Sequence, residues 1–229
     1  MRTVLLALAF IPLMILAVRI LLVCVIFGLR EAFIAYAHWL MRVGLWILGI
    51  ELEVTGLDRL DAGTPYIYMS NHLSFLDGPA LVAVIGRPVR VIVKRFVFRI
   101  PVLGLGMRFV GYVPLEKEGA GAGRKSIAMA ARLIREKGYS FLIFPEGTRS
   151  WDGKAQPFRR GGFFLALDCG TPIVPVTIRG TFALMPRGKW LVREGPVRIA
   201  FHEPVSVSGY TQDTLAELMA KVEAAVLSV

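Results

Sequence analysis

A long apolar stretch at the start of the chain constrains the fold more than any other feature. Residues 3–29 contain one charged side chain, Arg19, and exceed the roughly 20 apolar residues that a helix needs to cross a bilayer. The stretch therefore predicts a membrane helix. A cleaved signal peptide, with Arg2 in its charged start, is the alternative, but the run is too long and no small-residue cleavage site ends it.

A second apolar stretch follows at residues 32–50, after a short polar interruption. Glu31, His38 and Arg42 recur at helical spacing along one side of it, and such a polar stripe suits a helix at the membrane interface. Residues 1–50 are therefore predicted to form a membrane-embedded helical hairpin. It either enters and leaves one leaflet or crosses the bilayer twice, and both arrangements leave its two ends on the same side.

The remaining part of the chain, residues 51–229, predicts an α/β domain. Short β-rich runs alternate with helical stretches, and several runs are almost continuously apolar, which is typical of strands covered on both faces. The expected architecture is a mixed, mostly parallel sheet flanked by helices. Strands are expected at residues 66–69, 89–93, 140–144, 173–178 and 197–201, and helices at residues 77–84, 124–137, 162–169 and 211–227.

The charge balance favours an anionic partner. The chain has 27 Lys and Arg against 17 Asp and Glu, a formal net charge of +10, which suits phospholipid, a phosphorylated substrate or nucleic acid. Nucleic acid fits least, because the apolar stretch points to a membrane and no nucleic-acid-binding module is recognisable. The 2 cysteines give neither a disulfide framework nor a metal-binding spacing, so no metal is expected.

The first candidate for chemistry lies at the end of the expected strand 66–69. His72 follows this strand and Asp77 begins the next helix, and the carboxyl ends of strands are where open α/β sheets bind ligands. Across this turn the carboxylate could hold one ring nitrogen and leave the other free as a general base. Ser74 lies in no nucleophile elbow, so the reacting hydroxyl would come from the substrate. The alternative is that His72 only caps the start of the helix and has no catalytic role.

A second candidate follows the expected strand 140–144, in the sequence Pro145 to Ser150. Arg149 could fork onto phosphate oxygens, Gly147 permits close backbone approach, and Thr148 supplies a hydroxyl donor. Glu146 adds a carboxylate. A glycine turn with a surface ion pair is the alternative.

Basic residues also gather between these two candidates, with no acidic residue among them. They suit anionic headgroups or the phosphates of an acyl carrier, although a solvated face explains any single one equally well. The residues are Arg87, Arg90, Lys94, Arg95, Arg99 and Arg108, of which Lys94 is the strongest candidate.

In this order the motifs resemble the glycerolipid acyltransferases, especially the bacterial 1-acylglycerol-3-phosphate acyltransferases. Four blocks match over roughly residues 50–205. Asn71, His72 and Asp77 resemble the first block, and residues 144–150 resemble the third. The second block is matched by Lys94, Ile100, Pro101, Gly104 and Gly111, and the fourth by residues 172–176.

The resemblance implies that His72, oriented by Asp77, deprotonates a lipid hydroxyl that attacks the thioester of acyl-CoA or acyl-carrier protein. The expected product from 1-acylglycerol-3-phosphate is phosphatidic acid. No cofactor is expected beyond the acyl donor. The residues implied in substrate binding are Asn71, Ser74, Lys94, Lys117, Glu146, Gly147, Thr148 and Arg149.

Two departures from the family pattern leave the acceptor open. Phe96 stands where many relatives have Glu, and Glu116-Lys117 stands where they commonly have Asp-Arg. Another lysophospholipid or a lyso-aminolipid such as lyso-ornithine lipid, thioester hydrolysis, and a non-catalytic membrane-binding role are the alternatives. Thioester donors are cytosolic, and segments rich in Lys and Arg tend to remain on the cytoplasmic side of a membrane. The domain is therefore expected on the cytoplasmic face of the cell's inner membrane.

Overall fold

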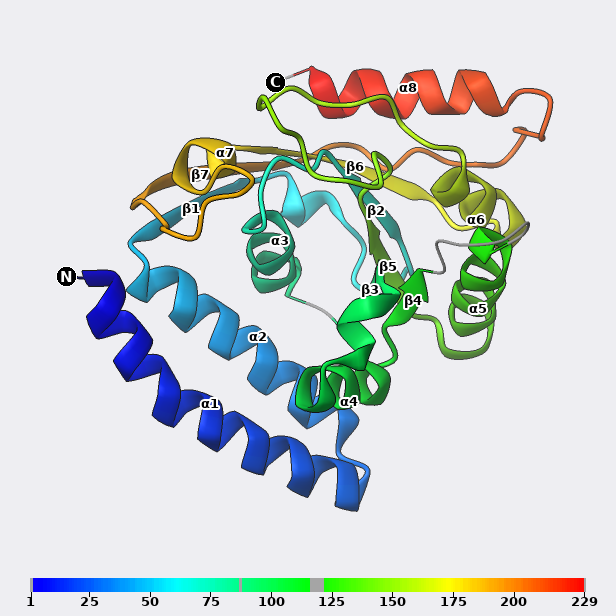
Figure 1. The fold of residues 1–229 in the computed structure, drawn as a ribbon. Helices are drawn as coiled ribbons and strands as arrows, with labels where there is room; N and C mark the ends of the chain where they lie inside the picture. Colours follow the sequence, from blue (N-terminus) through cyan, green and yellow to red (C-terminus); the bar gives the residue numbers. More distant parts are fainter. Residues whose placement is uncertain (1, 87, 116–121, 229) are drawn as a thin grey trace.

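The chain begins with two antiparallel helices that form a hairpin (Figure 1). The computed structural model describes residues 2–86, 88–115 and 122–228, in which α1 (Arg2–Phe27) and α2 (Arg30–Ile47) lie against each other. The turn between them contains Gly28 at φ 68°. The expected pair of helices is thus present. Within the described ranges, no helix combines the length and apolarity that crossing a membrane requires.

A seven-stranded sheet forms the body of the molecule, with the strand order β1-β7-β6-β2-β5-β3-β4. All neighbouring strands are parallel except β6 and β7, which are antiparallel. The expected mixed, mostly parallel sheet is therefore confirmed. The strands are β1 (Ile50–Thr55), β2 (Ile67–Ser70), β3 (Val89–Lys94), β4 (Val113–Leu115), β5 (Ser140–Ile143), β6 (Ile173–Arg179) and β7 (Gly195–Phe201).

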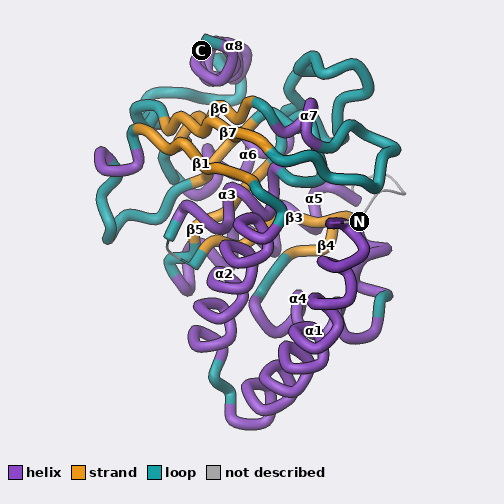
Figure 2. Tube along the Cα trace, turned by 90° about the vertical axis from the view of Figure 1, so that its left-hand side faces the viewer, coloured by secondary structure: helices purple, strands orange, loops and turns teal. Residues whose placement is uncertain are grey.

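Helices cover both faces of this sheet, as Figures 1 and 2 show. The alternation of side chains along β2 explains why both faces are apolar: Tyr68 joins the core on one side, whereas Ile67 and Met69 join the core on the other. The first face packs against α2 and α3 (Asp77–Ile85). The second packs against α5 (Ala122–Lys137), α6 (Gly161–Cys169) and α8 (Leu215–Leu227).

The hairpin shares a core with the sheet. Leu45 of α2 is buried within the same apolar cluster as Tyr68 and Ile199, and Met41 and Leu48 pack against that cluster. Burial of such side chains stabilises the docked position of α2 by about 1.5–3 kcal/mol for each fully buried one. Helix α2 therefore packs on the sheet through the same apolar core that α3 uses.

Several elements were not predicted from the sequence. Edge strand β1 carries Glu51 and Glu53 and directly follows the hairpin, and β4 contains Pro114. Helix α4 (Pro101–Val110) contains Gly104 and Gly106, which lower intrinsic helix propensity. Two 3₁₀ turns, η1 (Leu57–Arg59) and η2 (Arg95–Arg99), and the short helix α7 (Thr181–Leu184) complete the described elements.

The register of β2 and β5 sets the position of the candidate site. Met69 pairs with Ile143 in parallel, so the segments that follow the two strands leave the sheet at the same edge. These segments contain His72 and Glu146. Two motifs that are far apart in the chain thereby become neighbours.

Candidate active site

The side chains of His72 and Asp77 form the centre of the site. Nδ1 of His72 lies 2.9 Å from Oδ2 of Asp77, the contact that their spacing predicted. The same carboxylate oxygen accepts hydrogen bonds from the backbone N–H groups of Leu73 at 2.6 Å and Ser74 at 2.7 Å. Asp77 is fully buried and opens helix α3, where a negative charge is favoured. Its carboxylate is therefore fixed in position before any substrate binds.

This geometry gives the two nitrogens of His72 different roles. With Nδ1 donating to Asp77, Nε2 carries the lone pair that accepts a proton. One face of the ring stacks on Phe144, with centroids 4.0 Å apart and an angle of 17° between the planes. The side chain of His72 stays 19% exposed, so a substrate can reach a base whose orientation is already set.

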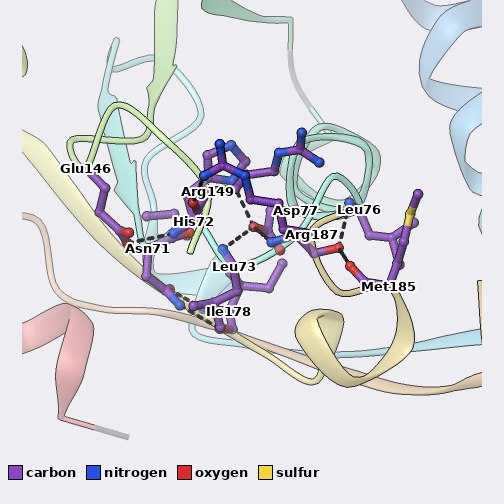
Figure 3. Close-up of polar contacts among 12 residues, drawn as sticks. Asn71, His72, Leu73, Leu76, Asp77, Glu146, Arg149, Ile178, Met185 and Arg187 are labelled. Atoms are coloured by element: carbon purple, nitrogen blue, oxygen red, sulfur yellow. Dashed lines mark hydrogen bonds and ion pairs between the residues drawn. The ribbon is translucent and has the colours of Figure 1, made fainter. Parts of the chain in front are cut away.

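The backbone of His72 is held on both sides by the turn after β5, and Figure 3 shows the side where Glu146 lies. Its N–H donates to Oε1 of Glu146 at 2.8 Å, and its carbonyl accepts from the N–H of Ser150 at 2.9 Å. Gly147 lies between these two residues at φ 72°, a left-handed conformation that favours glycine. The second candidate motif therefore holds the first in place.

Glu146 is a buried carboxyl group, with a relative exposure of 1%. Its pKa is raised to about 7, mainly by burial and also by the nearby charge of Asp77, although hydrogen bonds from the backbone of His72 and Gln156 act in the opposite direction. The group is thus poised between its two protonation states near neutral pH. Its contact with the backbone of His72 shows that Glu146 holds the His72 turn, and its expected contact with substrate stays a prediction.

Two other expected substrate contacts are also turned toward the protein interior. Asn71 exchanges two hydrogen bonds with the backbone of Ile178, at 2.9 and 2.8 Å. Ser74 is fully buried, and its Oγ donates to the carbonyl of Met185 at 2.7 Å. Since these contacts use the polar side-chain atoms, Asn71 and Ser74 tie the His72 turn to β6 and to the loop after α7. A substrate contact from either one stays a prediction.

Two partly buried arginine side chains form the rim of the site. The guanidinium of Arg149 lies 5.8 Å from the ring of Phe75, which belongs to the same turn as His72. Arg187 donates to Thr148 Oγ1 at 3.1 Å and to the carbonyl of Arg149 at 2.6 Å. It also stacks on Trp151 at 3.9 Å. These contacts bring two guanidinium groups to the turn after β5.

Arg187 is not among the site residues that the sequence predicts. It lies in the loop between α7 and β7, 38 residues from Arg149, and it follows no strand end that could have marked it. The pairing with Thr148 depends on how this long loop folds back over the site. The sequence offered only one signal, a basic residue in the Pro186-Arg187-Gly188 turn.

The remaining expected residues are placed in part. Lys94 ends β3, which is parallel to β5, so it lies at the same edge of the sheet as the site. Lys117 and Arg87 fall outside the described residues. Among the residues that the structure describes, no cluster of His, Cys, Asp or Glu could hold a metal ion.

The fold and the site together define a class: an α/β protein with a buried Asp and a partly exposed His after a central strand, next to two arginines from separate loops. Residues 51–179 match the family model described as Acyltransferase. The chain therefore belongs to the acyltransferase family, as the motifs had suggested.

Known relatives agree with this assignment. A chloroplastic 1-acyl-sn-glycerol-3-phosphate acyltransferase of Brassica napus is 39% identical over 68% of this chain and 45% of its own length. A 1-acyl-sn-glycerol-3-phosphate acyltransferase of Borreliella burgdorferi is 30% identical over 62% of this chain and 56% of its own. The chain thus spans about half the length of these curated relatives.

A solved structure matches over almost the whole chain. The crystal structure of the 1-acyl-sn-glycerophosphate acyltransferase PlsC from Thermotoga maritima superimposes with a TM-score of 0.82 at 27% identity. The match covers 99% of this chain and 95% of that one. It includes the N-terminal helices as well as the sheet.

Proposed function

We propose that the protein transfers a fatty acyl group from an acyl thioester to the free hydroxyl of 1-acylglycerol-3-phosphate, which yields phosphatidic acid. The observation that carries the proposal is the His72–Asp77 contact, which leaves Nε2 of His72 as a base on the accessible side of the ring. The names of the relatives in Brassica napus and Borreliella burgdorferi support this acceptor.

The reaction follows from this geometry. Nε2 of His72 takes the proton of the lipid hydroxyl as its oxygen attacks the thioester carbonyl, and Asp77 stabilises the imidazolium that forms. The tetrahedral intermediate collapses by breaking the carbon–sulfur bond. The leaving thiolate then takes the proton back from Nε2, so an ester and a free thiol result and the enzyme is regenerated. No protein nucleophile is required.

The phosphate of the acceptor is assigned to the arginine rim. Arg149 and Arg187 would hold its oxygens, because planar guanidinium groups bind phosphate through paired hydrogen bonds. Thr148 is bonded to Arg187 and would keep that guanidinium in place, while Lys94 and Lys117 would add charge. A phosphate monoester carries up to two negative charges near neutral pH, so several cations are needed to balance it.

The acyl donor is proposed to be acyl-CoA or acyl-carrier protein, with no further cofactor. The hairpin is proposed to embed in the inner membrane with the α/β domain on its cytoplasmic face, where acyl thioesters and lyso-lipids meet. Exposed apolar side chains along α1, such as Ile15, Leu22 and Ile26 at 52%, 48% and 75%, support contact with lipid.

A different lyso-lipid acceptor is the second candidate. Phe96, which stands in place of the family's Glu, is 61% exposed in η2, directly after Lys94 and Arg95. An exposed aromatic ring at this position gives no polar contact to a phosphate, so an acceptor with a larger or different headgroup fits it equally well.

A panel of acceptors tests the proposal. Purified protein is assayed with acyl-CoA and acyl-carrier protein against 1-acylglycerol-3-phosphate, lysophosphatidylglycerol, lysophosphatidylethanolamine and lyso-ornithine lipid. We expect the highest kcat/KM with 1-acylglycerol-3-phosphate. Equal rates across the panel would rule out this acceptor as the specific one, and rapid release of free fatty acid without an acceptor would indicate a thioesterase.

A further inference from the structure

A cavity of about 510 Å³ lies away from His72, between α4, β4 and α5. None of its lining residues belongs to the His72 turn, to the turn after β5 or to the loop that carries Arg187. The hairpin contributes Arg30 at the start of α2. Its lining includes Arg30, Arg95, Arg99, Arg108 and Tyr139.

The lining is strongly basic. Among the residues that the structure describes, the lining includes four arginines and no Asp or Glu. Two of these arginines are held in place by the protein: Arg108 donates to the carbonyl of Phe98 at 3.0 Å, and Arg30 donates to Tyr139 Oη at 3.3 Å. Guanidinium groups that are fixed in this way lose little freedom when they bind an anion.

A buried arginine behind the wall adds to this positive charge. Arg90 is fully buried, and its guanidinium lies 3.8 Å from the ring centroid of Tyr139. Its Nη2 reaches Oε1 of Glu31 at a long 3.4 Å, and that partner is 61% exposed. Nε and Nη1 of Arg90 have no hydrogen-bond partner in the part of the chain that the structure describes. A buried cation with so little compensation is costly, and an anion in the adjacent cavity would offset that cost.

The pKa of Tyr139 is affected by the positive charge around the cavity. Burial acts to raise the pKa of its hydroxyl, but the hydrogen bond from Arg30 and the positive charges of Arg90 and Arg30 outweigh this, and the pKa is lowered. A tyrosine on the wall of the cavity is thus surrounded by positive charge from two sides.

Exposed apolar side chains border the cavity on two elements. Arg30 follows the end of α1, where Ile26 and Phe27 are 75% and 71% exposed. Arg99 precedes α4, where Val102 and Leu103 are 44% and 45% exposed. Helices α1 and α4 contact each other, so the two apolar groups lie on neighbouring helices. Basic side chains beside an exposed apolar surface are typical of proteins that bind anionic lipid.

We propose that this cavity binds the phosphate headgroup of an anionic glycerophospholipid of the bilayer, at a site separate from the one that contains His72. The arginines hold the phosphate, while the apolar residues of α1 and α4 contact the acyl region next to it. This site would orient the protein on the membrane, and it does not depend on which acceptor the enzyme uses.

The test compares two double variants with the same loss of charge. Arg95→Gln with Arg99→Gln removes two cavity arginines. Arg132→Gln with Arg198→Gln is the control, because these side chains are 73% and 72% exposed and line neither the cavity nor the site. Full-length proteins are sedimented with vesicles of phosphatidylcholine alone and of phosphatidylcholine with phosphatidylglycerol. Circular dichroism and thermal unfolding confirm that each variant folds.

We expect the cavity variant to bind the anionic vesicles roughly 25-fold more weakly than the wild type, about fivefold for each arginine. Its binding to neutral vesicles should be unchanged, and the control should behave as the wild type. Equal weakening of both variants would show diffuse surface attraction and overturn the proposal, as would no weakening of either.

Soluble ligands distinguish the source of the phosphate. Inorganic phosphate and CoA are added in thermal unfolding experiments with the wild type and the cavity variant. We expect neither to stabilise the wild type more than the variant. Selective stabilisation by CoA would reassign the cavity to the acyl donor, and selective stabilisation by inorganic phosphate would reassign it to a free anion.

Turnover separates this site from the reaction. With substrates in detergent micelles, a third variant, Arg30→Gln, should keep the wild-type kcat, because this cavity arginine belongs to α2 and bonds to Tyr139, which is not a residue of the candidate active site. A loss of kcat in micelles would place the cavity within the reaction site and contradict a separate lipid site.

Discussion

The carboxylate of Glu146 accepts a hydrogen bond from the backbone N–H of His72 at 2.8 Å. This bond crosses from the turn after β5 to the turn after β2, and Ser150 adds a second bond to the carbonyl of His72. The position of the general base is therefore set by its main chain as well as by Asp77. Changes at Glu146 and at Asp77 should have different effects, because one residue holds the backbone and the other holds the ring.

Replacing Asp77 by Asn should lower kcat about 10²- to 10⁴-fold, because an amide neither fixes the required tautomer of His72 nor stabilises its imidazolium. The KM for the acceptor should change little. Steady-state kinetics with both substrates provide the measurement. A kcat within threefold of the wild type would show that Asp77 serves only to hold the turn, and Leu73 and Ser74 would then be its main partners.

Replacing Glu146 by Gln should alter how stability depends on pH. The folded-state pKa is about 7 against an ordinary value of 4.5, so between these values the unfolded chain releases this proton while the folded protein keeps it. Wild-type stability should therefore fall as pH rises from about 4.5 to about 7, by at most about 3 kcal/mol from this group. The variant should lack this decline.

Chemical denaturation across this pH range provides the measurement, expressed as the difference between the two proteins. Burial lowers the pKa of His202, which produces a trend of opposite sign, but that trend is common to both proteins and cancels. A difference that stays constant with pH would contradict a raised pKa at Glu146.

Replacing Arg187 by Ala should raise the KM for a phosphate-bearing acceptor about tenfold to a hundredfold, the cost expected when a charged hydrogen-bonding group is lost. The kcat should fall far less. Arg187→Lys should restore part of the affinity because it keeps the charge without the fork. The matched control is Arg193→Ala, an exposed arginine in the same loop. A KM that responds equally to both Ala variants would remove Arg187 from the binding site.

Replacing Gly147 by Ala should destabilise the turn that holds His72. The residue has φ 72°, and an added Cβ would lie 3.1 Å from Nε of Arg159. The backbone conformation alone should cost about 1–2 kcal/mol in the free energy of unfolding. Gly123→Ala is a suitable control, because nothing lies within 4 Å of its added Cβ and its φ is not left-handed. Equal stability of the two variants would contradict the strain at Gly147.

Much of the fold followed from local patterns. Apolar runs such as residues 173–178 marked central strands because strands covered on both faces must be apolar throughout, and glycines marked helix ends. The His72–Asp77 contact followed from spacing along one turn. Strand β4 was missed since it is three residues long and contains a proline, and α4 was missed since Gly104 and Gly106 weaken its helical pattern.

Long-range contacts could not be predicted in the same way. Asn71 pairs with Ile178 and Arg187 pairs with Thr148 only because the sheet order and the loop after α7 bring them together. The inward orientation of Asn71, Ser74 and Glu146 likewise depends on packing that no local pattern encodes. The sequence motifs therefore indicated which turns meet at the candidate site, but not which of their side chains point inward.

The most direct test of general-base catalysis by His72 is the acyl-transfer rate of His72→Ala with 1-acylglycerol-3-phosphate and acyl-CoA. His202→Gln is the control, because His202 bonds to Thr177 outside the site. We expect kcat to fall about 10²- to 10⁴-fold in His72→Ala, with folding and membrane attachment intact. The control variant should have a kcat close to that of the wild type. Acyl transfer at the wild-type rate in His72→Ala would contradict general-base catalysis by this histidine.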